Sequence, residues 1–194
     1  MSASLQSICQ RIPKFAQSNT WQFADDVTQS EVAVTTEAVI SKLEETFLRT
    51  KNFCQDKRLN INEAKTQLII FKSAAKRIPD NIVLNLDSCM IKAQPQVKLL
   101  GVTLDNHLTM KDHISTTVNT CNGLLGVMRR TTHVMPRDLT KLFYMAMVRS
   151  HLEYASSLLI PVAKSHLEKL DIIQRKAARI ICQVPSDSPL TRRT

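Results

Sequence analysis

Hydrophobic and polar positions in the first hundred residues predict short strands around one long helix. Thr20–Ala24 and Val27–Val34 are rich in large and β-branched apolar residues, which is typical of strands. From Val39 to Cys54 apolar residues recur at the period of an amphipathic helix, with Thr35 and Thr36 as candidate N-caps. Further short strands are predicted at residues 67–71, 82–84, 89–91 and 97–104, the last one bent at Gly101.

The second half of the chain predicts three helices. Ile114–Met128 has apolar residues at alternating spacings of four and three, and Arg129 and Arg130 follow it. A second helix, beginning near Pro136, is apolar nearly all round, which predicts a central position. The last helix, at about 165–182, separates an apolar side from four basic residues: Lys169, Arg175, Lys176 and Arg179. Together the two halves predict an α+β fold.

The charge of the chain is concentrated in the second half. The 194 residues include 26 Lys and Arg and 17 Asp and Glu, a net charge of +9. Residues 107–194 hold 13 of the basic and 6 of the acidic residues, so this part contributes +7. Such a local excess indicates a polyanionic partner. From charge alone, an ordinary solvated surface is an equally good explanation.

Composition excludes several classes of protein. Three glycines cannot form a Gly-rich phosphate loop. Five cysteines without a C-x-x-C pair, and histidines that are never four residues apart, exclude the common structural zinc motifs. No apolar stretch is long enough to span a membrane, and no apolar segment near the N-terminus is typical of a secretory signal. We therefore expect an intracellular protein, nuclear or cytoplasmic, that is not secreted and does not bind membranes.

Asp25 and Asp26 lie between the first two predicted strands, which suggests a hairpin with the acids at its bend. Asp is common in turns, so from these two residues alone a solvated turn is the better explanation. The segment Phe23-Ala24-Asp25-Asp26, however, resembles the aromatic-x-Asp-Asp hairpin of reverse transcriptases.

Three further segments follow in the same order and spacing. Leu59–Thr66 is similar to the L-x-x-N-x-x-K-T segment of LINE-type (jockey-like, non-LTR) retrotransposon reverse transcriptases. Lys98–Asp105 is similar to their K-Y-L-G-V-x-L-D strand, with Leu99 where the family usually has Tyr. The helical segment that follows in the family is matched by His113, Ser150–Tyr154 and Leu170–Ile181. The resemblance extends from about residue 18 to residue 184.

The resemblance implies an RNA-directed DNA polymerase, a nucleotidyltransferase of a transposable element. Residues 1–105 would be a truncated palm with a short antiparallel sheet and one long helix. Residues 106–184 would be an α-helical thumb, and we expect 185–194 to be a disordered tail. The implied partners are an RNA template and a DNA primer. The implied small molecules are dNTP and Mg²⁺ or Mn²⁺.

The resemblance also implies roles for individual residues. Asp25 would ligate the metal, with Asp26 beside it, because hard cations take carboxylate oxygens. Lys65 would approach the incoming triphosphate, although a solvent-exposed lysine is an equally good interpretation. Lys98 lies on the strand that would follow the primer backbone. The remaining candidate nucleic-acid contacts are Arg129, Arg130, Lys169, Arg175, Lys176 and Arg179.

The first palm Asp of the family lies upstream of its Asp-Asp hairpin, and residues 1–17 contain no acidic residue. One Asp pair cannot hold two cations about 4 Å apart. We therefore expect a reverse transcriptase fragment that does not polymerise by itself. Two alternatives stay open: a non-catalytic basic nucleic-acid-binding module, and a helical protein-interaction remnant in which the charge is incidental.

Overall fold

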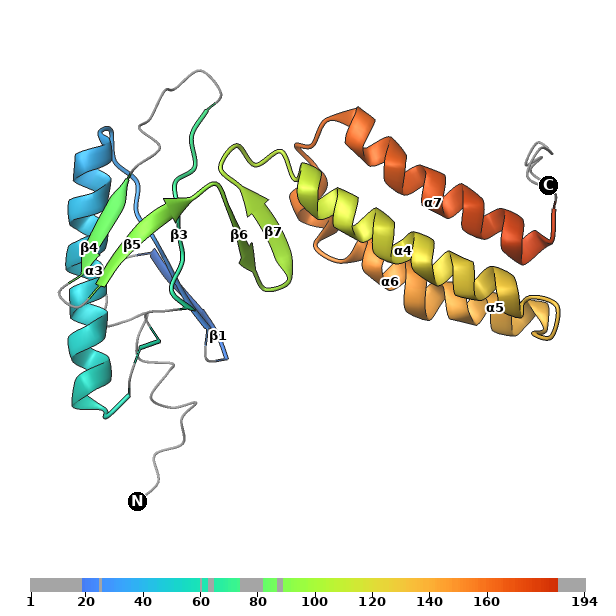
Figure 1. The fold of residues 1–194 in the computed structure, drawn as a ribbon, viewed down its shortest axis with the longest axis horizontal. Helices are drawn as coiled ribbons and strands as arrows, with labels where there is room; N and C mark the ends of the chain where they lie inside the picture. The colour runs from blue at the N-terminus through green and yellow to red at the C-terminus, as the bar shows by residue number, and fades with distance from the viewer. Residues whose placement is uncertain are drawn as a thin grey trace. The chain divides into compact units, whose positions relative to one another are not determined.

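The computed structural model describes residues 19–24, 26–59, 61–62, 65–73, 82–86 and 89–184. The chain divides into two compact units, Met1–Pro95 and Gln96–Thr194, and each is described by itself (Figure 1). Strands and one long helix form the first unit, and mainly helices form the second, which confirms the predicted α+β class. The predicted tail 185–194 and Asp25 lie outside the described residues.

The first unit begins with an antiparallel pair of strands, β1 (Asn19–Phe23) and β2 (Asp26–Ser30), followed by α3 (Thr36–Asp56). A second sheet has the order β3-β5-β4, made of Leu68–Ile69, Cys89–Gln94 and Val83–Leu86 respectively. The strands β4 and β5 pair antiparallel, as predicted, whereas β3 pairs with β5 in parallel. The sequence pattern did not indicate this parallel pair, because the strand period carries no information on direction.

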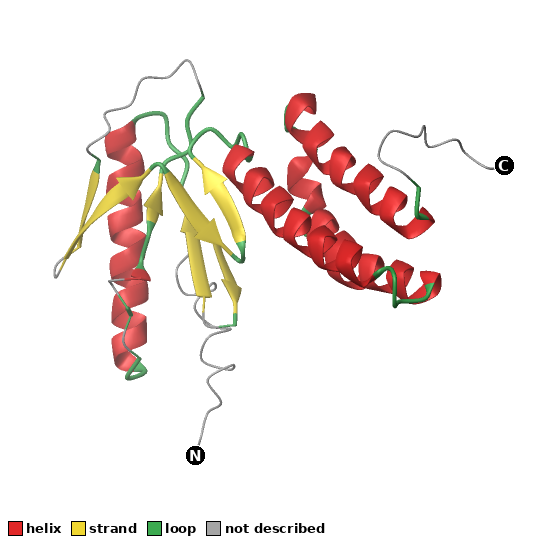
Figure 2. Ribbon diagram, turned by 45° about the vertical axis from the view of Figure 1, so that its right-hand side comes forward, coloured by secondary structure: helices red, strands yellow, loops and turns green. Residues whose placement is uncertain are grey.

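Helix α3 forms where the apolar period predicted it. The Thr35 hydroxyl accepts a hydrogen bond from the backbone N–H of Ala38 and caps the helix, as expected. One side of α3 packs on the three-stranded sheet, which contributes the buried residues of this core (Figure 2). The core side chains are Leu68, Leu84 and Ile91 from the strands, with Ile40, Leu43 and Phe47 from the helix.

The second unit starts with β6 (Gln96–Leu99) and β7 (Val102–Asp105), an antiparallel hairpin. We predicted one bent strand here. Leu100 and Gly101 both have positive φ, +46° and +83°, which turns the chain back on itself. Val102 of β7 is buried in the core of the helices that follow. The compact units thus separate ten residues before the predicted palm–thumb boundary at 105/106.

Helices form the rest of the second unit. They are α4 (Lys111–Thr131), α5 (Arg137–Phe143), the π-helical η2 (Tyr144–Arg149), α6 (Ser150–Glu153), the 3-10 turn η3 (Ser156–Leu159) and α7 (Lys164–Cys182). The segments α5, η2 and α6 follow one another without a break. The largest fully buried side chains of this unit are Ile114, Cys121, Met128, Val148 and Ile173.

The helix predicted to be central is not central. Val148 and Thr140 are buried, but Leu139 and Leu142 expose 51% and 62% of their surface. Three helices can enclose a core only by placing it between them, so each helix keeps one side without a neighbour in this unit. An apolar residue on that side therefore stays at the surface.

Candidate nucleic-acid interface

The β1–β2 pair positions the acidic residues. Asp26 begins β2, lies opposite Phe23 in the register and has an exposed side chain. Ala24 precedes the undescribed Asp25 and has a left-handed backbone with φ of 53°. This conformation is costly for alanine and marks a tight turn. The Asp26 carboxylate is therefore accessible at a sharp bend of the chain.

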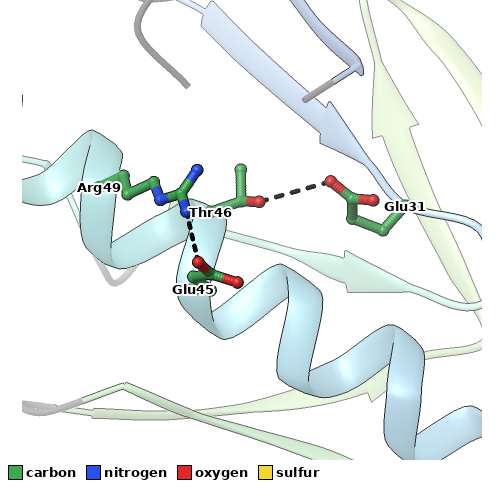
Figure 3. Close-up of polar contacts among 4 residues, drawn as sticks. All are labelled: Glu31, Glu45, Thr46 and Arg49. Atoms are coloured by element: carbon green, nitrogen blue, oxygen red, sulfur yellow. Dashed lines mark hydrogen bonds and ion pairs between the residues drawn. The ribbon is translucent and has the colours of Figure 1, made fainter. Parts of the chain in front are cut away.

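Two hydrogen bonds attach the β1–β2 pair and its exit to α3. The Gln29 amide donates to the Thr50 hydroxyl at 2.7 Å, and the Thr46 hydroxyl donates to the Glu31 carboxylate at 3.4 Å. Figure 3 shows the second contact beside the ion pair that Arg49 makes with Glu45 one turn earlier on α3. Both threonines are buried, so these hydrogen bonds lie in a low-dielectric environment, where a hydrogen bond is electrostatically stronger than in water.

The described residues do not fit a two-cation centre. In the ranges that the structure describes, no group of three or more His, Cys, Asp or Glu side chains is close enough to hold a metal ion. Asp26 contributes one exposed carboxylate there. Asp25, the other member of the acidic pair, lies outside the described residues.

Lys65 lies in a turn that Asn62 organises. The backbone N–H of Lys65 donates to the Asn62 carbonyl at 3.1 Å, and the Thr66 hydroxyl donates to the same carbonyl. The Asn62 side-chain oxygen also faces the Lys65 N–H at 3.3 Å. The Lys65 side chain is exposed, so both interpretations of this lysine stand. Asn62 is the Asn of the L-x-x-N-x-x-K-T motif, and this turn gives it a structural role that the motif alone did not indicate.

Lys98 projects from the β6–β7 hairpin with an exposed side chain, opposite Thr103 in the register. The turn of this hairpin is held from the other side of the unit. The Tyr154 hydroxyl donates a hydrogen bond to the Leu100 carbonyl. Tyr154 thus links the two similarity segments Lys98–Asp105 and Ser150–Tyr154.

Asp105 joins the hairpin to α4. Its carboxylate accepts hydrogen bonds from the backbone N–H groups of His107, Thr109 and Met110, at 3.0, 3.0 and 2.8 Å, and from the Thr109 hydroxyl. Burial raises the pKa of this carboxyl, but the hydrogen bonds from Thr109, Met110 and His107 outweigh it and lower the pKa overall. Asp105 therefore organises the turn that leads into α4, and sequence reasoning had not singled out this role.

The predicted basic residues lie on α4 and α7. Arg129 and Arg130 are exposed in the last turn of α4, where positive charge is favourable. On α7, Lys169, Arg175 and Lys176 are exposed, whereas Arg179 is partly buried. These residues form the basic part of the helical unit.

One polar contact joins α7 to α4, and another joins α5 to α7. The Lys176 ammonium donates to the Asn122 side-chain oxygen of α4 at 3.4 Å. The Arg137 guanidinium, at the start of α5, donates to the Cys182 sulfur at the end of α7 at 3.5 Å. Consequently the end of α4, the start of α5 and the end of α7 lie at one end of the helical unit (Figure 1). Arg137 adds a basic residue there that sequence reasoning missed, although it follows Pro136 in the basic half.

Sequence comparison finds one informative similarity. Over 168 residues, 84% of this chain, the sequence is 26% identical to the "RNA-directed DNA polymerase from mobile element jockey" of Drosophila melanogaster. The chain spans 18% of that protein's length. No family model and no solved structure matches the chain. None of the helices in the described ranges is long and apolar enough to cross a membrane. The similarity confirms the resemblance seen in the motifs: over most of its length the chain is similar to part of the jockey RNA-directed DNA polymerase.

Proposed function

We propose that this chain is the portion of a mobile-element reverse transcriptase that runs from the Asp-Asp hairpin through the thumb. The similarity to the jockey polymerase over 168 residues supports this origin. The order of the four motifs supports it independently. In this proposal Asp25, Asp26 and Lys65 derive from the catalytic palm, and the helices of the second unit derive from the thumb.

The activity proposed for the isolated 194-residue chain is binding of a nucleic-acid backbone by its helical unit. The observation that carries this proposal is the set of exposed basic side chains on α4 and α7, in the half of the chain that contributes +7 of the net charge. Lys and Arg bind phosphates without reading bases, so we expect affinity for template–primer duplexes regardless of their sequence.

Polymerisation by this isolated chain is not part of the proposal. The family's chemistry uses Mg²⁺ or Mn²⁺, and one Asp pair cannot hold two such ions about 4 Å apart. None of the residues before Asp25 in this sequence is acidic. Asp25 and Asp26 would then retain the position of catalytic residues without the activity.

A binding assay and a primer-extension assay test the two parts separately. A labelled RNA–DNA duplex should bind the purified chain, and its affinity should fall steeply between about 50 and 200 mM salt. No primer should be extended with Mg²⁺ or Mn²⁺. If the parent chain extended the primer and the Asp25→Ala variant did not, the proposed inactivity of the isolated chain would be refuted. Absence of any duplex binding would refute the binding function and favour a helical protein-interaction role.

A further inference from the structure

The basic residues of α7 do not form one strip, as the sequence pattern suggested. Lys169 and Lys176 are seven residues apart, so they lie on the same side of α7, about 10 Å apart along its axis. The bond from Lys176 to Asn122 shows that this side adjoins α4. Arg175 precedes Lys176 by one residue and therefore points about 100° away from it.

Helix α4 places its own basic residues on the adjoining side. Arg129 follows Asn122 by seven residues and thus lies on the same side of α4, two turns on. Arg130 starts about 100° round the helix from Arg129, but its guanidinium lies 3.8 Å from where a Cβ of Gly126 would stand. Gly126 follows Asn122 by four residues and is about 40° from it, so this charge folds back toward the same side. We call the exposed surface lined by Lys169, Lys176, Asn122, Arg129 and Arg130 the α4–α7 seam.

The seam carries positive charge only. Its four charged side chains are basic, and α4 has no acidic residue from His113 to its end at Thr131. Lys169, Arg129 and Arg130 are exposed, and Lys176 keeps two donors besides the one it offers to Asn122. Such a surface attracts a row of phosphates, and about 10 Å of duplex corresponds to about three phosphates of one strand.

The side of α7 that carries Arg175, roughly 100° round the helix from the two lysines, is electrically balanced. Lys164, Glu168, Asp171 and Arg175 are separated by four, three and four residues, so they share one side of the helix. All four side chains are exposed, and their charges cancel. Oppositely charged residues at these spacings are typical of a solvated helix surface.

We propose that a nucleic-acid phosphate backbone binds along the α4–α7 seam through Lys169, Lys176, Arg129 and Arg130, while the balanced side of α7 stays in solvent. This inference rests on the proposed binding function and adds the location of the contact. It removes Arg175 from the contact set and makes the two lysines of α7 its centre.

Two double variants of the full 194-residue chain test the location. Lys169→Ala/Lys176→Ala and Lys164→Ala/Arg175→Ala remove the same charge from the same helix. Binding of a labelled RNA–DNA duplex of about 20 base pairs is measured by fluorescence anisotropy over a series of salt concentrations. The seam variant should lose about tenfold or more in affinity, and its salt slope should fall by about 2, one for each lost phosphate contact. The matched variant should stay within about twofold of the parent.

Two controls separate charge from structure. Asn122→Ala removes the contact with Lys176 and keeps every charge, so its salt slope should equal that of the parent. Lys169→Arg/Lys176→Arg keeps the charge and should keep the salt slope. Equal losses in the two alanine pairs, or no loss in the seam pair, would overturn the location. A parent chain that binds anionic vesicles but no duplex would overturn the proposed function itself.

Discussion

The Tyr154 hydroxyl donates a hydrogen bond to the Leu100 carbonyl, and the two residues are 54 positions apart in the sequence. The same tyrosine lies over Gly101, with ring carbon Cε1 3.6 Å from where a Cβ would stand. The contact fixes the β6–β7 turn against the end of α6. It joins Lys98–Asp105 and Ser150–Tyr154, two segments that the motif resemblance identified separately. The contact therefore gives the two segments a shared structural role.

Tyr154→Phe should destabilise the second unit by about 1 kcal/mol, the usual net contribution of one hydrogen bond. The ring still covers Gly101, so only the hydroxyl is lost. Denaturant unfolding, followed by circular dichroism at the helix band, measures the change. A free energy of unfolding equal to that of the parent would show that the bond does not contribute in solution.

Gly101→Ala should destabilise by at least about 1 kcal/mol. Its φ of +83° is unfavourable for a residue with a Cβ, whereas the Tyr154 ring, 3.6 Å away, would make only ordinary van der Waals contact with that Cβ. The same unfolding experiment tests this variant. If alanine were tolerated, the turn would have to relax, and the Tyr154 contact would be expected to weaken with it.

Gly123→Ala should change the free energy of unfolding in the opposite direction and stabilise the second unit by roughly 0.5–1 kcal/mol. Gly123 lies within α4, and an added Cβ there meets no atom within 4 Å. Alanine therefore gains helix propensity without a clash. Comparison with Gly101→Ala makes an internal control, because the chemical change is identical. A destabilised Gly123→Ala protein would contradict the open surface around this position.

Asp105→Ala should lower stability at neutral pH by about 1 kcal/mol or more, because it removes the charged acceptor of four hydrogen bonds in the turn before α4. Because the folded-state pKa of Asp105 lies below its ordinary value, its stabilisation is present above that ordinary value and is lost as pH falls through the folded-state pKa. The parent should therefore lose stability below about pH 4 more steeply than the variant. Unfolding free energies measured from pH 2 to 7 test this; parallel curves would contradict it.

Several features of the fold follow directly from local patterns. The apolar period placed α3, α4 and α7, and the Thr35 cap was recognisable from its position. The β4–β5 hairpin was also predicted. In contrast, the bent strand at 97–104 became a hairpin, since the positive φ of Leu100 cannot be inferred from a leucine in a strand-like segment.

The candidate site was only partly predictable. Sequence identified every basic residue of the α4–α7 seam, yet it grouped Lys176 with Arg175. The missing information was which residues of α4 lie beside α7. Asn122 has no distinguishing pattern of its own, and its contact with Lys176 joins residues 54 positions apart.

Sequence by itself determined the helices, the acidic pair between two strand-like segments, the basic excess of the second half and the family resemblance. These depend on the period of neighbouring residues, on composition and on motif order. Tertiary structure alone decided that Tyr154 meets Gly101, that β3 runs parallel to β5 and which side of α7 adjoins α4. Helix rotation and strand direction are set by the packing of distant apolar residues, which local periodicity does not encode.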